Sequence, residues 1–256
     1  KESTPPPPLE ALRLEDFAVY SGSDRREASL KFKEASAVVR LGPLFHKEIQ
    51  ITSVVLVKPV IRLAKESDGK IGPKGVHIPV SSPNTGTVGG SVSSAGPILF
   101  SVDSFRLEGG ELYFEDLSSS PPIGLTLQDL DAEVKGFSLS KPFSFKASGA
   151  LFSSRQNLSV EGRFTLPQAG KPGALDDLSL TADLAEFNLE DISRALRSRV
   201  LENMAGELTV KVDHLDLSEK GFAAAKGDLI LQHGSLKLAS ARSAFTNMQL
   251  SAFMNG

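Results

Sequence analysis

Residues 49–63 read IQITSVVLVKPVIRL, and this stretch decides the fold class. A period of two in its apolar residues predicts an extended strand, because alternate side chains of a strand share one face. Pro59 has no backbone N–H for a ladder, which predicts a strand edge or a β-bulge at that point. The apolar face is expected to carry the odd positions: Ile49, Ile51, Val55, Val57, Ile61 and Leu63.

Strand patterns recur along most of the chain. Residues 158–166 and 178–184 alternate apolar side chains with Ser, Thr, Glu, Arg or Asp, which is typical of a strand with one buried and one wet face. Short connections favour predominantly antiparallel pairing. Further strands are expected at 12–20, 28–41, 100–107, 111–116, 125–134, 143–151, 208–212 and 229–238.

One short amphipathic helix is expected to interrupt the strands. Asn188 is a good N-cap residue, and Gly206 is expected to end the helix. Apolar residues between them recur at helical spacing: Ile192, Leu196, Val200 and Met204.

The chain is expected to contain one β domain with two appendages. Residues 1–11 form a Pro-rich linker, since Pro5–Pro8 favour a semi-rigid polyproline II spacer; a disordered terminus or an SH3-type ligand are the alternatives. Residues 12–256 form the domain, within which 65–97 are a long loop rich in Gly, Ser and Pro. Such a loop either links two parts of the sheet or overhangs a functional opening.

Composition excludes several classes of function. The net charge of −3 and a sequence pI near 5.9 argue against nucleic-acid binding, which normally needs a concentrated basic face. Cysteine is absent, so there is no thiolate metal site and no cysteine nucleophile. No run of about 18 apolar residues occurs, so any membrane span is expected outside this chain.

Catalytic patterns are not found in the sequence. Glu111 and Glu115 would share a strand face about 13 Å apart, which is too far for a glycosidase pair. His214 and Asp216 have strand spacing, but two ligands do not make a metal site. We therefore expect no enzyme activity, no metal and no cofactor. The alternative, an enzyme, would need convergent polar groups in a pocket.

Several segments together resemble the amino-terminal region of AsmA-family proteins. The resemblance extends over most of the chain. It is carried by LGPL (41–44), IQITSV (49–54), KPVIRL (58–63), DG (68–69), FRLEGGELYFED (105–116), LTLQDL (125–130), LEDI (189–192) and MAGEL (204–208).

The resemblance implies a bacterial envelope protein in the periplasm, tethered to the inner membrane by an N-terminal segment outside this chain. It implies a long, curved antiparallel sheet that forms an open groove or a flattened half-barrel. The implied partners are phospholipid or another membrane lipid, the membrane through the anchor, and envelope proteins. The implied function is to shield acyl chains in an apolar groove and so contribute to outer-membrane lipid homeostasis.

The alternation of apolar and polar residues alone indicates which residues would line such a groove. One face of the sheet would offer acyl chains a continuous apolar wall. The same residues would equally suit the core of a closed β-sandwich, which would make the domain a non-catalytic scaffold or protein-interaction module. The candidate lipid-binding residues are Val160, Phe164, Leu180, Leu184, Val210 and Val212.

Overall fold

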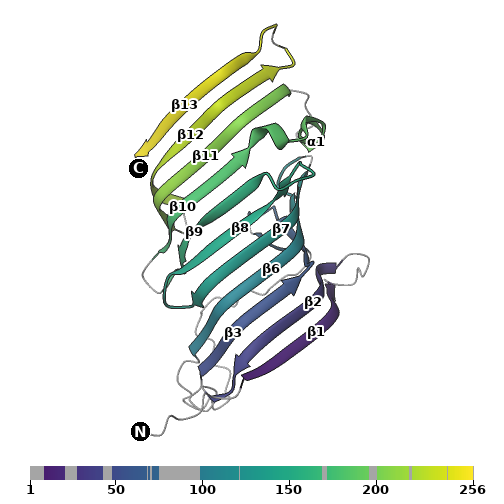
Figure 1. Cartoon of the computed structure of the whole chain (residues 1–256), viewed down its shortest axis with the longest axis vertical. Helices are drawn as coiled ribbons and strands as arrows, with labels where there is room; N and C mark the ends of the chain where they lie inside the picture. Colours follow the sequence, from purple (N-terminus) through teal and green to yellow (C-terminus); the bar gives the residue numbers. More distant parts are fainter. Residues whose placement is uncertain are drawn as a thin grey trace.

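The computed structural model describes residues 9–20, 28–42, 48–67, 69, 71–74, 99–120, 122–168, 172–195, 201–218, 221–240 and 242–255. All strands of this part of the chain belong to one thirteen-stranded sheet. The sheet stacks its strands roughly in chain order along the long axis of the molecule (Figure 1). It stays open, because β1 (Leu9–Tyr20) pairs only with β2 and β13 (Phe245–Asn255) pairs only with β12.

The long strands account for most of the described residues, and one α-helix, α1 (Leu189–Ala195), interrupts them. A 3-10 turn, η2 (Leu184–Glu186), precedes the helix. The remaining strands are β2 (Ala28–Arg40), β3 (Glu48–Val57), β4 (Val60–Lys65), β5 (Ile71–Pro73), β6 (Leu99–Asp116), β7 (Ile123–Ser138), β8 (Phe143–Leu151), β9 (Leu158–Thr165), β10 (Gly173–Asp183), β11 (Leu201–Ser218) and β12 (Gly221–Leu238).

The strand order is β13-β12-β11-β10-β9-β8-β7-β6-β3-β2-β4-β5, with β1 on the far side of β2. Nearly all pairings are antiparallel, but β6 runs parallel to both β3 and β4. Parallel neighbours need a long crossover, and the chain between β5 and β6 is long enough to supply one. The predicted fold class is confirmed: mostly β, one large curved sheet that remains open, and a single helix in the described part.

The prediction that residues 49–63 form one strand with a single apolar face is wrong. The strand breaks at Lys58, which has a φ of 48°, and Pro59, so β3 and β4 are separate. Register then places Val55 beside Arg106 of β6, whereas Leu56 lies beside Leu107. The even positions of β3 near this break therefore carry the apolar face.

The helix prediction is confirmed at its start, and its predicted end is wrong. The Asn188 side chain accepts hydrogen bonds from the backbone N–H groups of Glu190 (2.9 Å) and Asp191 (3.4 Å), as an N-cap does. The helix α1 spans Leu189–Ala195, and the chain is already in β11 at Leu201. Leu196 and Val200, which were predicted on the helix, lie outside the described residues. Met204 and Gly206, read as the end of a helix, lie inside that strand.

The predicted appendages are partly strand. Residues 9–11, assigned to the linker, are the first residues of β1, while Pro5–Pro8 lie outside the described residues. The start of the predicted long loop contains the last residue of β4 and all of β5. The rest of that loop, residues 75–97, lies outside the described residues.

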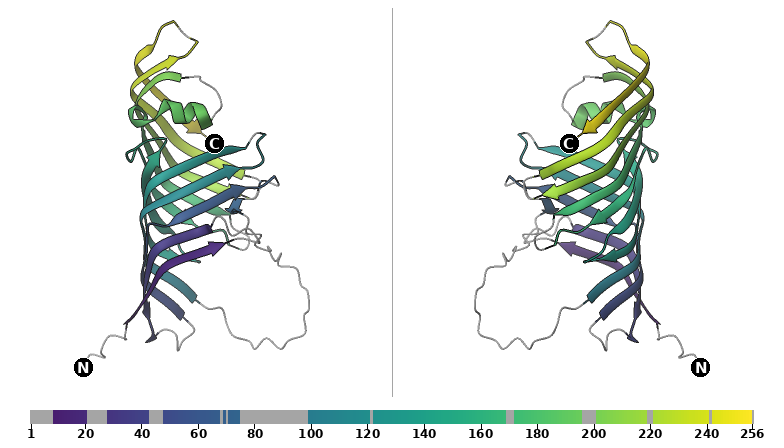
Figure 2. Two further views of the ribbon diagram at one scale, coloured as in Figure 1. Left: turned by 90° about the vertical axis from the view of Figure 1, so that its right-hand side faces the viewer. Right: turned by 90° about the vertical axis from the view of Figure 1, so that its left-hand side faces the viewer.

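The sheet is curved and twisted rather than flat (Figure 2). Residues with a positive φ lie at matching heights on several strands. Where the register also shifts, as at Gly109 and Gly206, the bulge bends the strand and increases its twist. Two lines of positive-φ residues cross the sheet. One runs from Asp16 of β1 through Lys58, between β3 and β4, to Gly109 of β6 and Asp129 of β7, and the other consists of Gly206, His233 and Asn247 in β11 to β13.

Gly206 shows how strictly the backbone at one of these bulges requires glycine. Its φ is 119°, and a methyl group there would lie 2.8 Å from the carbonyl oxygen of Gln232 and from Cα of Gly234. We expect Gly206→Ala to lower the free energy of unfolding by about 1–3 kcal/mol, measured by urea denaturation. Gly124→Ala is the matched control, because no heavy atom lies within 4 Å of its added methyl. Equal denaturation midpoints for the two variants would contradict the requirement for glycine at position 206.

Candidate functional site

One row of apolar side chains crosses the sheet from edge to edge. It takes one residue from every strand except β4 and β5, and each residue is the direct ladder partner of the next, so all of them point to the same face. The row runs Leu14, Ala35, Leu56, Leu107, Ala132, Ala147, Val160, Leu180, Val210, Leu229 and Ala252.

A second apolar row lies two residues along the strands on the same side. Its residues are again ladder partners, except at one register shift between β9 and β10. Together the two rows define what we name the apolar face. The second row runs Leu12, Ala37, Val54, Phe105, Val134, Phe145, Gly162, then Leu178, Val212 and Gly227.

Four of the six candidate residues from the sequence lie in these rows: Val160, Leu180 and Val210 in the first and Val212 in the second. Phe164 lies beyond the second row, paired with Phe143 of β8 and Leu175 of β10. Its ring centroid is 5.5 Å from that of Phe143, which is 5.1 Å from Phe137, so three rings cluster there.

Leu184, the remaining candidate, is not part of a strand. It begins η2, where the side chain of Asp183 accepts a hydrogen bond from the backbone N–H of Ala185 (3.0 Å) and ends β10.

Sequence reasoning missed the half of the apolar face that β1 to β8 contribute. Leu56 is an even position and so lies outside the expected apolar face of odd positions, and Leu107 is not among the candidate residues. The only available signal was the apolar character of the even positions Val54 and Leu56. Their partners Phe105 and Leu107 become known only from the register of β3 on β6.

The apolar face has no second sheet over it within the described part of the chain, because every strand there belongs to the same sheet. Few side chains are consequently removed from solvent. Ten hydrophobic side chains are buried among the described residues, and four of these are alanines. Val160, Leu180 and Val210 in the middle are half-buried, whereas Leu14 at one edge is 47% exposed.

The opposite side of the same strands is charged, and we name it the charged face. The row next to the first apolar row places opposite charges on neighbouring strands, which favours the pairing. Arg106 and Glu133, for example, form an ion pair at 3.3 Å. From β6 to β12 this row runs Arg106, Glu133, Lys146, Glu161, Ser179, Lys211 and Asp228.

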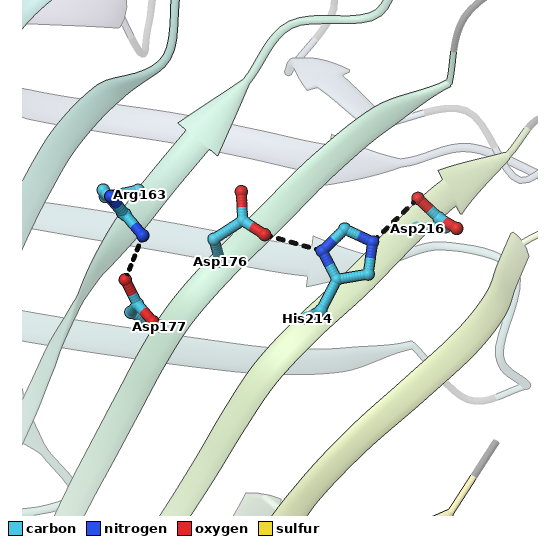
Figure 3. Close-up of polar contacts among 5 residues, drawn as sticks. All are labelled: Arg163, Asp176, Asp177, His214 and Asp216. Atoms are coloured by element: carbon cyan, nitrogen blue, oxygen red, sulfur yellow. Dashed lines mark hydrogen bonds and ion pairs between the residues drawn. The ribbon is translucent and has the colours of Figure 1, made fainter.

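A cluster on the charged face joins β9, β10 and β11 (Figure 3). Nδ1 of His214 lies 2.6 Å from a carboxylate oxygen of Asp176, and Nε2 lies 3.1 Å from Asp216. Arg163 forms an ion pair with Asp177 beside them. Other strands of the sheet pass behind the ribbon that carries these side chains. The charged face therefore looks outward, and the apolar face looks toward the inside of the curve.

The His214 contacts require the doubly protonated ring. A neutral imidazole has one N–H and cannot donate to two carboxylates, whereas the imidazolium can. The hydrogen bond to Asp176, followed by that to Asp216, raises the pKa of His214 above its usual 6.5. Because the pKa is raised in the folded state, this stabilisation is fully present below the usual pKa of 6.5, where both carboxylates are still ionised, and is lost as the pH rises through the raised value.

One cleft on the charged face lies beside the helix. Its volume is about 410 Å³, it lies between α1 and the strands β7 and β8, and its lining includes Thr126, Gln128 and Phe152. The carboxylate in its lining is Asp191, which is already bound to Arg194 at 2.7 Å. Among the described residues, no group of three potential ligands could hold a metal ion.

No protein family, curated protein or solved structure matches this chain. Within the described residues, no helix is both long and apolar enough to cross a membrane. The candidate site therefore rests on the geometry of the sheet itself.

The His214 contacts predict an elevated titration midpoint. Following the four histidines by NMR against pH, we expect one of them to titrate above 6.5, and the variant His214→Gln identifies it. Asp176→Asn should lower that midpoint, because it removes the carboxylate with the larger effect. Asp228→Asn, on the same face but opposite Lys211, is the control and should leave it nearly unchanged. A midpoint at or below 6.5 in the unaltered protein would refute the assignment.

Proposed function

We propose that this chain is a lipid-handling module that shields phospholipid acyl chains on the apolar face of its curved sheet. The observation that supports it is the row of ladder partners from Leu14 to Ala252, which offers acyl chains an apolar wall uninterrupted by charge. Acyl chains need no specific polar partner, and removing them from water is favourable in proportion to the area buried.

The dimensions of the apolar face suit acyl chains. Crossing the strands from β1 to β13, the first row spans ten interstrand spacings of about 4.8 Å, or roughly 48 Å along the sheet. Along β9, the distance from Leu158 to Phe164 is six residues, or about 20 Å. One leaflet of a bilayer has about 15 Å of hydrocarbon, so a chain of that length fits across the face.

In this proposal the two faces of the sheet have different roles. The charged face keeps the module in water, since its opposite charges lie on neighbouring strands, as in Lys146 and Glu161. The apolar face gains from covering its half-buried side chains. A lipid whose tails lie on the apolar face would leave its headgroup at the rim, so the site would select for acyl chains more than for a particular headgroup.

The cellular setting in this proposal comes from the resemblance to AsmA-family proteins. It is a periplasmic domain, held at the inner membrane by a segment outside this chain, that contributes to outer-membrane lipid homeostasis. The alternative is a non-catalytic envelope scaffold, in which the apolar face binds protein rather than lipid.

Photocrosslinking in cells separates these functions. A photoreactive residue is placed at Val160, Leu180 or Val210, and adducts are identified by mass spectrometry. We expect lipid adducts at all three positions, because these residues are consecutive ladder partners in the first row.

Matched controls lie one residue away on the charged face, at Ser159, Thr181 and Lys211. These positions should give no lipid adducts, since alternation turns them away from the apolar face. Protein adducts alone at the first three positions would favour the scaffold, and equal lipid labelling of both sets would contradict a lipid-binding face.

A further inference from the structure

The cleft beside α1 adjoins a second cleft on the charged face. The second cleft has a volume of about 350 Å³, is lined from β4, β6 and β7, and shares Gly124 and Thr126 with the first. Ladder pairing places Thr126 beside Tyr113 of β6, and Tyr113 beside Arg62 of β4. We name the two clefts together the polar furrow. Ligand sites in proteins usually measure about 300–1,000 Å³, so each cleft has the size of a small-ligand site.

Phe152, in the lining next to α1, has a strained backbone. Its φ is 49°, a conformation that bulky side chains rarely adopt, and it is the one apolar residue among the seven non-glycine residues of the described part with a positive φ. The side chain of Asn157 bonds the N–H (2.9 Å) and the C=O (3.2 Å) of Leu151, and the N–H of Asn188 donates to the carbonyl of Phe152. Strain that is held in this way is typical of ligand-binding positions.

Hydrogen-bonding groups in the polar furrow are available to a ligand. Within the described part of the chain, no protein group bonds the amide of Gln128 or the hydroxyl of Thr126. Ser153 accepts a hydrogen bond from the backbone N–H of Arg155 (3.1 Å) and keeps its own O–H to donate. Amides and hydroxyls both donate and accept, so they suit a ligand whose groups also do both.

The charges of the polar furrow already have partners. Arg194 lies 2.7 Å from Asp191, and Lys74 lies 2.9 Å from Glu115. The guanidinium of Arg62 lies over an aromatic ring, 4.7 Å from its centroid. An anionic ligand would have to displace a carboxylate from its cation, whereas a neutral ligand leaves these pairs intact. The lining therefore favours a neutral, hydroxyl-rich ligand.

We propose that the polar furrow binds a neutral saccharide. A sugar ring has an apolar C–H face, which packs on an aromatic ring such as that of Phe152, and hydroxyl groups, which bond Gln128 and Thr126. The second cleft takes the next sugar unit of the chain, because the two clefts meet at Gly124. This site lies on the charged face and does not depend on whether the apolar face holds lipid.

Gly124 offers a way to block the polar furrow without disturbing the sheet. A methyl group added there would meet no heavy atom within 4 Å. Gly124→Leu therefore fills the junction of the two clefts rather than clashing with the protein. Ser159→Leu is the matched control, because it adds the same side chain at an exposed position elsewhere on the charged face.

The full chain is applied to an array of short neutral oligosaccharides of glucose, galactose, mannose and N-acetylglucosamine, together with their sulfated and phosphorylated counterparts. We expect at least one neutral oligosaccharide to bind, and its dissociation constant is then measured by isothermal titration calorimetry. Gly124→Leu and Gln128→Ala should raise that constant about tenfold or more, whereas Ser159→Leu should leave it unchanged. Phe152→Gly, which tolerates the positive φ but lacks the ring, should also weaken binding.

Binding to none of the neutral oligosaccharides, or to the anionic ones alone, would overturn the proposal. Equal effects of the two leucines would contradict the location of the site, and unchanged affinity in Phe152→Gly would exclude packing on that ring. Circular dichroism of each variant confirms that it is folded. None of these results would alter the lipid crosslinks expected at Val160, so the two proposals fail separately.

Discussion

Ladder register is the constraint on which the rest of this structure depends. Because side chains alternate with a period of two, a slip of one residue between any two strands would move a whole set of apolar side chains to the other face. The sheet contains several register shifts and yet keeps its apolar face. At the bulge beside Gly109, Leu107 pairs with Ala132 on one side and Leu112 pairs with Leu127 on the other. The bulges bend the sheet without exchanging its faces.

In a single-layer sheet, this register leaves one apolar face without a second sheet to cover it. In a two-layer sandwich, the apolar faces of both sheets cover each other and form a core. Here the described strands all belong to one sheet, and residues in the middle of the apolar face remain half-buried. The free energy available from covering such a face is what a lipid-handling function would use, while alternating charges keep the other face hydrated.

The sequence predicted the sheet and, where alternation was uninterrupted, residues that lie on its apolar face. Val160, Leu180 and Val210 were found because β9, β10 and β11 alternate cleanly, and the structure makes them neighbours in one row. It failed where the backbone departs from regular strand geometry. Lys58, with its positive φ, separates β3 from β4, and Gly206 lies in a strand bulge rather than at a helix end. Register between distant strands, such as β3 and β6, leaves no local pattern, so half of the apolar face could not be assigned.

Whether the apolar face carries acyl chains is best tested by native mass spectrometry of the full chain, expressed in a bacterial periplasm and purified without detergent. The account predicts mass adducts that dissociate as phospholipids, together with phospholipid recovered from the same sample by solvent extraction. A protein that shows only its own mass and releases no lipid, while retaining its β-sheet circular dichroism, would contradict the account.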